Sequence, residues 1–65
     1  MRDINRIDKF CSELAEVWKN NACDLRFGQL INNVLGDMQA SGRDIFFPEE
    51  DEMMKFIKDY FNKDK

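Results

Sequence analysis

The sequence predicts an all-α fold, a compact three-helix bundle with a short extended aromatic connection before the third helix. Three stretches of the chain repeat apolar residues at the three- and four-residue spacing of amphipathic helices. Residues that favour helix ends separate these stretches. The chain has 65 residues, of which 43% are hydrophobic, so it can form one small core. We therefore expect a single helical domain over residues 1–65.

The first stretch, residues 4–19, has one wide apolar face. That face consists of Ile4, Ile7, Cys11, Leu14 and Trp18, and is widened by Phe10, Ala15 and Val17. Asp3 is expected to cap the start of this helix, and the pair Asn20 and Asn21 to end it.

The two cysteines, Cys11 and Cys23, are predicted to be free thiols. A helix that runs to about residue 19 carries the chain beyond disulfide reach of Cys11 before Cys23 is reached. We expect Cys11 to lie in the core and Cys23 to be partly buried beside the following turn.

The second stretch, residues 25–40, is expected to begin after Asp24 as its cap and to stop at Gly42. Its apolar arc consists of Phe27, Leu30, Ile31, Val34, Leu35 and Met38. At about 100° per residue these side chains fall on one side of a helix, which is expected to face the core.

An extended connection, "RDIFFP", leads to the third helix. Phe47 precedes a proline and is therefore disfavoured in a helix, whereas Pro48 suits the first helical position. An alternative is that residues 44–47 pair as a short strand in an oligomer. The buried stripe of the third helix is expected to contain Met53, Phe56, Ile57, Tyr60 and Phe61, with Met54 at its margin and Lys63 and Lys65 at the carboxyl end.

Composition and charge limit the classes of function that we expect for this chain. The net charge is −3 with no run of Lys or Arg, which disfavours nucleic-acid binding. No apolar stretch approaches the roughly 20 residues of a membrane span, and the N-terminus lacks the apolar core of a signal peptide, so we expect a cytoplasmic protein. Histidine is absent, which removes the commonest general base and ordinary Cys/His zinc ligands. We expect no enzyme activity, no cofactor and no metal.

One cluster of carboxylates, the acidic patch Glu49, Glu50, Asp51 and Glu52, opens the third helix. Its first interpretation is electrostatic, because acidic residues stabilise the positive end of a helix dipole. Consecutive helical residues point in different directions, so a divalent-ion site is a weaker alternative. The third interpretation is that the patch forms an acidic surface that binds a basic partner.

The outer side of the second helix is almost uncharged, although 35% of the chain is charged. Its candidate interface residues are Arg26, Gln29, Asn32, Asn33 and Gly36. Amides and glycines permit close backbone approach and hydrogen bonding, which favours a protein contact. A solvated face and packing within the bundle remain as alternatives. Arg26 in a first helical turn is electrostatically unfavourable, so we expect it to pair with a carboxylate or to hold an anionic ligand or acidic partner.

The runs "VWKNNACDLRFGQLINNVLGD" and "IFFPEEDEMMKFI" resemble a group of uncharacterised small bacterial and phage proteins. The resemblance covers about residues 14–58, and departs where many members have proline and this chain has Cys23. It implies a compact helical protein of bacterial or phage origin and transfers no active site. It also suggests that Arg26 clamps Glu50 or Asp51.

These observations predict a small acidic protein-interaction module that binds a protein partner or itself, with a homodimer as the expected form. A phage or mobile-element accessory or inhibitor protein is the most specific version. The alternative is a small-anion or nucleotide-binding module that uses Arg26 and the amide side of the second helix.

Overall fold

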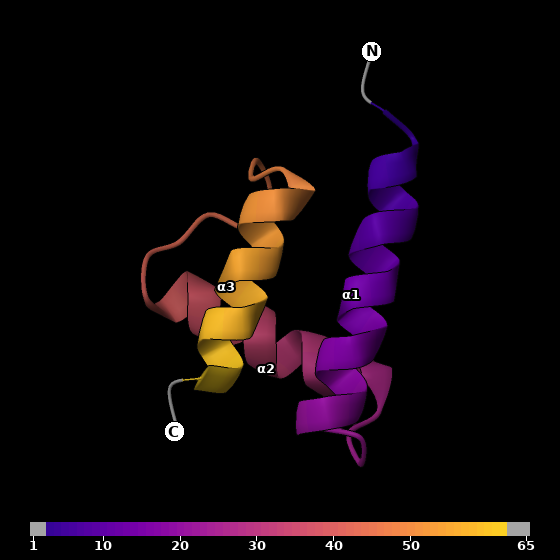
Figure 1. Ribbon diagram of the computed structural model, residues 1–65. Helices are drawn as coiled ribbons and strands as arrows, with labels where there is room; N and C mark the ends of the chain where they lie inside the picture. Colours follow the sequence, from indigo (N-terminus) through magenta and orange to yellow (C-terminus); the bar gives the residue numbers. More distant parts are fainter. Residues whose placement is uncertain (1–2, 63–65) are drawn as a thin grey trace.

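The computed structural model describes residues 3–62, which form the helices α1 (Asn5–Asn21), α2 (Phe27–Ala40) and α3 (Glu50–Asn62). The predicted all-α three-helix bundle is confirmed, and no strand occurs within residues 3–62. α3 packs against both other helices. In Figure 1, α1 and α3 lie side by side and α2 passes behind them at a steep angle. The expected positions of Lys63 and Lys65 lie outside the described residues.

Two ion pairs show that α1 and α3 run in the same direction. Arg6 Nε lies 2.7 Å from Glu50 Oε1, and Lys58 Nζ lies 3.1 Å from Glu13 Oε2. The residue numbers on the two helices rise together, so the helices are parallel. Connection 41–49 makes this possible by returning the chain to the end of the molecule where α1 begins (Figure 1). Two positive helix ends therefore lie at one end of the bundle.

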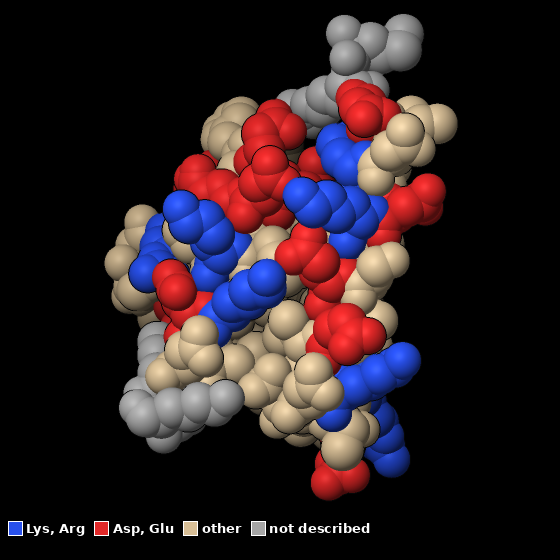
Figure 2. All heavy atoms as spheres, viewed as in Figure 1, with Lys and Arg blue, Asp and Glu red and all other residues tan. Residues whose placement is uncertain are grey.

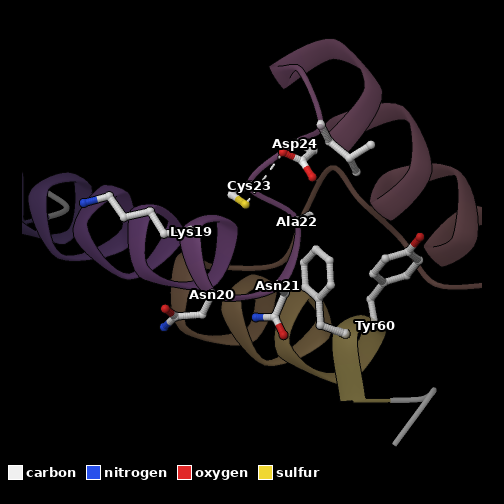
Figure 3. A pocket seen from close by; sticks show the side chains of 9 residues that line it. Lys19, Asn20, Asn21, Ala22, Cys23, Asp24 and Tyr60 are labelled. Carbon is white, nitrogen blue, oxygen red and sulfur yellow. Dashed lines mark hydrogen bonds between the residues drawn. The ribbon is translucent and has the colours of Figure 1, made fainter.

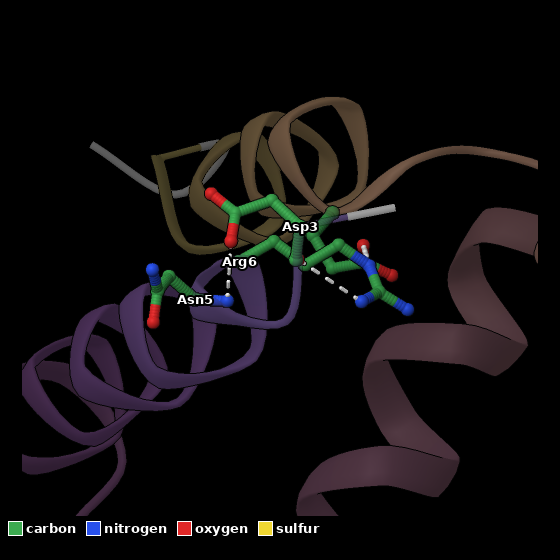
Figure 4. A network of polar contacts seen from close by, with 4 residues as sticks. Asp3, Asn5 and Arg6 are labelled. Atoms are coloured by element: carbon green, nitrogen blue, oxygen red, sulfur yellow. Dashed lines mark hydrogen bonds and ion pairs between the residues drawn. The ribbon is translucent and has the colours of Figure 1, made fainter. Parts of the chain in front are cut away.

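The start of α1 agrees with the predicted role of Asp3. Its Oδ1 accepts a hydrogen bond from the backbone N–H of Asn5 at 3.0 Å, and its carbonyl oxygen accepts one from Arg6 Nη1 at 3.3 Å (Figure 4). The guanidinium of Arg6 thus joins the first turn of α1 to Glu50 on α3.

The core is small. Its buried members are Val17 on α1, Leu30, Val34 and Met38 on α2, and Met54 and Ile57 on α3. The expected burial of Cys11 is wrong, because its thiol is exposed. The buried side of α1 is rotated toward Phe10 and Val17, since one neighbouring helix covers only part of the wide apolar face.

Met54 was expected at the margin of the α3 stripe and is instead buried. α3 contacts α1 on one side and α2 on another, so its buried arc is wider than a single helix contact requires. Of the residues expected in the α2 arc, Phe27 is 57% exposed, and its ring centroid lies 6.0 Å from that of Trp18.

α2 begins two residues later than predicted, and its cap is not Asp24. The residue before the helix is Arg26, with extended backbone at φ −74° and ψ 157°. Its backbone N–H donates to Gln29 Oε1 at 2.9 Å, which is one half of a capping box. The indole Nε1 of Trp18 donates to the carbonyl oxygen of Leu25 at 3.1 Å and fixes the preceding turn to α1.

α2 ends where the sequence predicts. Gly42 has φ +83°, a conformation that favours glycine. The Arg43 N–H donates to the carbonyl oxygen of Met38, and the Gly42 N–H to that of Gln39, which together form a Schellman motif. Pro48 lies two residues before α3 rather than at its first position.

Candidate interaction surfaces

The outer side of α2 is open to solvent. The predicted interface residues Arg26, Gln29, Asn32, Asn33 and Gly36 are all exposed. The structure therefore excludes packing of this side within the bundle and leaves solvation or an intermolecular contact. We call these five residues the amide face.

The structure shows no packing role for the two glycines of α2. A Cβ placed on Gly28 or on Gly36 would meet nothing within 4 Å. Glycine inside a helix destabilises it by about 1 kcal/mol relative to alanine. Among residues 3–62, no close approach to either glycine offsets this destabilisation.

The structure assigns different roles to two of the predicted interface residues. Gln29 uses its amide oxygen to cap α2, so it has a structural function. The proposed clamp between Arg26 and Glu50 or Asp51 is not formed within residues 3–62, where the Glu50 carboxylate is paired with Arg6 on α1 and no ion pair joins Arg26 to α3. Arg26 lies at the cap of α2, just outside its first turn, and is exposed.

The acidic patch lies at the end where α1 and α3 both begin. Figure 2 shows acidic side chains gathered over the start of α3. Glu50, Asp51 and Glu52 occupy the first turn of that helix, where they complement its dipole. Within residues 3–62, no three Asp, Glu or Cys side chains are grouped so that they could hold a metal ion.

The same end carries large apolar side chains that the sequence did not single out as a surface. Phe46 is 81% exposed, Phe47 is 78% exposed and Ile4 is 73% exposed, while Ile7 is exposed to a smaller extent. The rings of Phe46 and Phe47 meet edge to face, with centroids 4.8 Å apart. We call these four residues the apolar end. Adjacent phenylalanines outside any helical repeat were the only signal available in the sequence.

Asp44 holds the connection that presents this aromatic pair. One of its carboxylate oxygens accepts the Phe46 N–H at 3.1 Å, and the other accepts the Phe47 N–H at 2.9 Å. Both N–H groups are therefore occupied, and residues 44–47 form a bend instead of the strand that was considered as an alternative.

Of the hollows on the described surface, one of about 310 Å³ lies between Phe47, Glu52 and Phe56. Two others bear on the possible sites. One of about 290 Å³ lies at the apolar end, between Ile7 and Phe10 of α1, Phe46 of the connection, and Glu50 and Met53 of α3. A larger, open one of about 600 Å³ lies between the α1–α2 turn and the end of α3.

The larger hollow is lined by side chains of several chemical types, which include an amine, an amide, a thiol, a carboxylate and a phenol (Figure 3). Lys19 and Asn21 come from α1, Cys23 and Asp24 from the turn, and Tyr60 from α3. Cys23 was expected to be partly buried and is exposed instead, with its Sγ 4.0 Å from Asp24 Oδ1.

None of the helices described within residues 3–62 combines the length and apolarity needed to cross a membrane. The sequence matches no known protein family, and no curated protein or solved structure matches it either.

Proposed function

We propose that this chain is a small acidic protein-interaction module. The observation that carries the proposal is the apolar end, where the side chains of Phe46, Phe47 and Ile4 are largely exposed to solvent although the protein has a very small core. Contiguous exposed apolar patches on small soluble domains mark binding sites more often than single exposed residues do.

The size of this surface indicates the strength of the contact. A fully buried aromatic side chain covers about 150–250 Å². At the exposures observed, Phe46 and Phe47 together leave on the order of 300 Å² for a partner to cover. At about 25 cal/mol per Å² this gives roughly 7 kcal/mol before the costs of association. Because association itself costs about 4–15 kcal/mol, weak and reversible binding is the expected range.

We also propose that the chain forms a weak homodimer through the amide face. The amide face runs from Arg26 to Gly36, so it is about 15 Å long and offers on the order of 150 Å² per copy. Stable complexes bury about 800 Å² per partner. The exposed glycines support close contact of two backbones, but the area supports only reversible association at high concentration.

The most specific version of this proposal is a phage or mobile-element accessory or inhibitor protein. It takes up the resemblance noted for residues 14–58, and the exposed apolar end supports it. The alternative, anion binding by Arg26 and the amide face, has less support because the hollows described above are lined by other residues.

Native mass spectrometry of the protein, purified gently from its own host, tests the proposal. Masses at multiples of 7.8 kDa support self-association, and a larger adduct supports a protein partner. A bare monomer over a wide concentration range, with no adduct, would refute the interaction module.

A further inference from the structure

The hollow at the apolar end has the size of a side-chain anchor site. At about 290 Å³ it lies at or below the lower limit of pockets that enclose small-molecule ligands. Ile7, Phe46 and Met53 provide apolar walls, and Glu50 provides one charged wall. Such a site fits one or two bulky apolar side chains that project from a larger partner.

The connection next to the hollow is not prepared for strand addition. A strand that pairs with residues 44–47 would need backbone N–H donors from that segment. Asp44 already accepts the N–H groups of Phe46 and Phe47. Recognition must therefore use side chains, as in the docking of an amphipathic helix into a groove.

The charge around the apolar end selects the partner. Residues 44–52 contain five Asp or Glu residues and no Lys or Arg. Of the basic residues near this surface, Arg6 pairs with Glu50 and the Arg43 guanidinium lies 4.7 Å from the centroid of the Phe56 ring, while Lys9 and Lys55 line a hollow with Asp51 on another side of α3. A second copy of this chain would place acid against acid at this surface, which opposes self-association here.

We propose that the apolar end binds a basic amphipathic helix of another protein. Apolar residues of that helix enter the hollow and cover Phe46 and Phe47, while its Lys and Arg residues face Glu52, which lines a hollow with Phe47. This inference rests on the proposed function and specifies the partner's chemistry. The surface is separate from the amide face on α2, so the two contacts can be tested independently.

Fluorescence anisotropy with labelled synthetic peptides tests the inference. The probe is a Leu/Lys peptide of about 18 residues, or five helical turns, with all leucines on one face. One control peptide replaces each Lys by Glu, and a second has the Leu/Lys composition in scrambled order. We expect the probe to bind with a Kd below about 100 µM, and each control peptide at least tenfold more weakly, which corresponds to about 1.4 kcal/mol.

Matched variants locate the binding. The double substitution Phe46→Ser with Phe47→Ser should raise the Kd of the probe at least tenfold. Phe27→Ser removes another exposed phenylalanine, away from the apolar end, and should change the Kd less than twofold. Glu52→Lys should weaken binding several-fold, whereas Asp59→Lys makes the same change in net charge farther along α3 and should have a smaller effect.

Equal binding of the Leu/Glu peptide, equal loss from Phe27→Ser, or no binding of the probe would each overturn the proposal. Circular dichroism of every variant establishes that it is folded. A chain that binds no peptide but forms dimers or carries a protein adduct refutes only this inference. If the protein binds no peptide, forms no dimer and carries no protein adduct, the proposed function is refuted as well.

Discussion

Replacement of Gly36 by alanine is expected to stabilise the folded monomer and to weaken its self-association. Gly36 lies inside α2 and is exposed, and a Cβ at this position would meet nothing within 4 Å. The gain in helix propensity is about 1 kcal/mol. In a domain of this size, this raises Tm by about 4–8 °C. A methyl group on the amide face would in turn hold two α2 backbones apart.

The two effects are measured separately. Thermal unfolding followed by far-ultraviolet circular dichroism at low protein concentration reports the monomer, and sedimentation equilibrium over a concentration series reports the dimer. Gly42→Ala is the matched control, because the same chemical change falls at φ +83°. A Cβ in that conformation is strained by about 1–2 kcal/mol, so Tm should fall.

A lower Tm for the Gly36→Ala monomer would refute the view that this glycine has no role within the chain. A stabilised monomer that dimerises as well as the parent protein would refute the amide face as a close contact. Only opposite effects on monomer stability and on association support both parts of the argument.

Three further predictions follow from the fold. Met54 is buried, so Met54→Ala should lower the free energy of unfolding, measured in urea, by about 2–5 kcal/mol. Cys11 is exposed, so Cys11→Ser should change it by less than about 0.5 kcal/mol. Equal losses from the two substitutions would contradict the observed rotation of α1. Gln29→Ala should cost about 1 kcal/mol by removing the acceptor for the Arg26 N–H, and Gln29→Glu, which keeps an acceptor, should retain most of the stability in the same thermal assay. Inorganic phosphate should leave Tm unchanged relative to chloride at equal ionic strength, since a ligand that binds only the native state must stabilise it; a rise that Arg26→Ala abolishes would favour the anion-binding alternative.

Local sequence signals predicted the helices and several of their ends. Gly42 stops α2 because its conformation is difficult for other residues, and this depends on few distant contacts. Asp3 caps α1 for a similarly local reason. The start of α2 was missed because a cap can be made by the backbone and a later side chain. Here Gln29 accepts from Arg26, and Asp24 is not needed.

Burial was harder to predict than helicity. An apolar stripe on an isolated helix shows which side can be buried, but neighbouring helices determine how much of it is covered. On α1 the covered part includes Phe10 and leaves Cys11 and Ile4 outside. The parallel arrangement of α1 and α3 was equally inaccessible, because it depends on the path of connection 41–49.

The acidic patch alone does not identify a partner. Parallel α1 and α3 place two helix N-termini together, each equivalent to about half a positive charge, so carboxylates stabilise this end even in an isolated monomer. The same physical reasoning does not apply to Phe46 and Phe47. The fold gains little from large rings held in water, yet Asp44 fixes the bend that presents them. The proposed interaction surface therefore rests on the aromatic pair, and the basic charge proposed for its partner rests on the acids that lie at the same end of the fold.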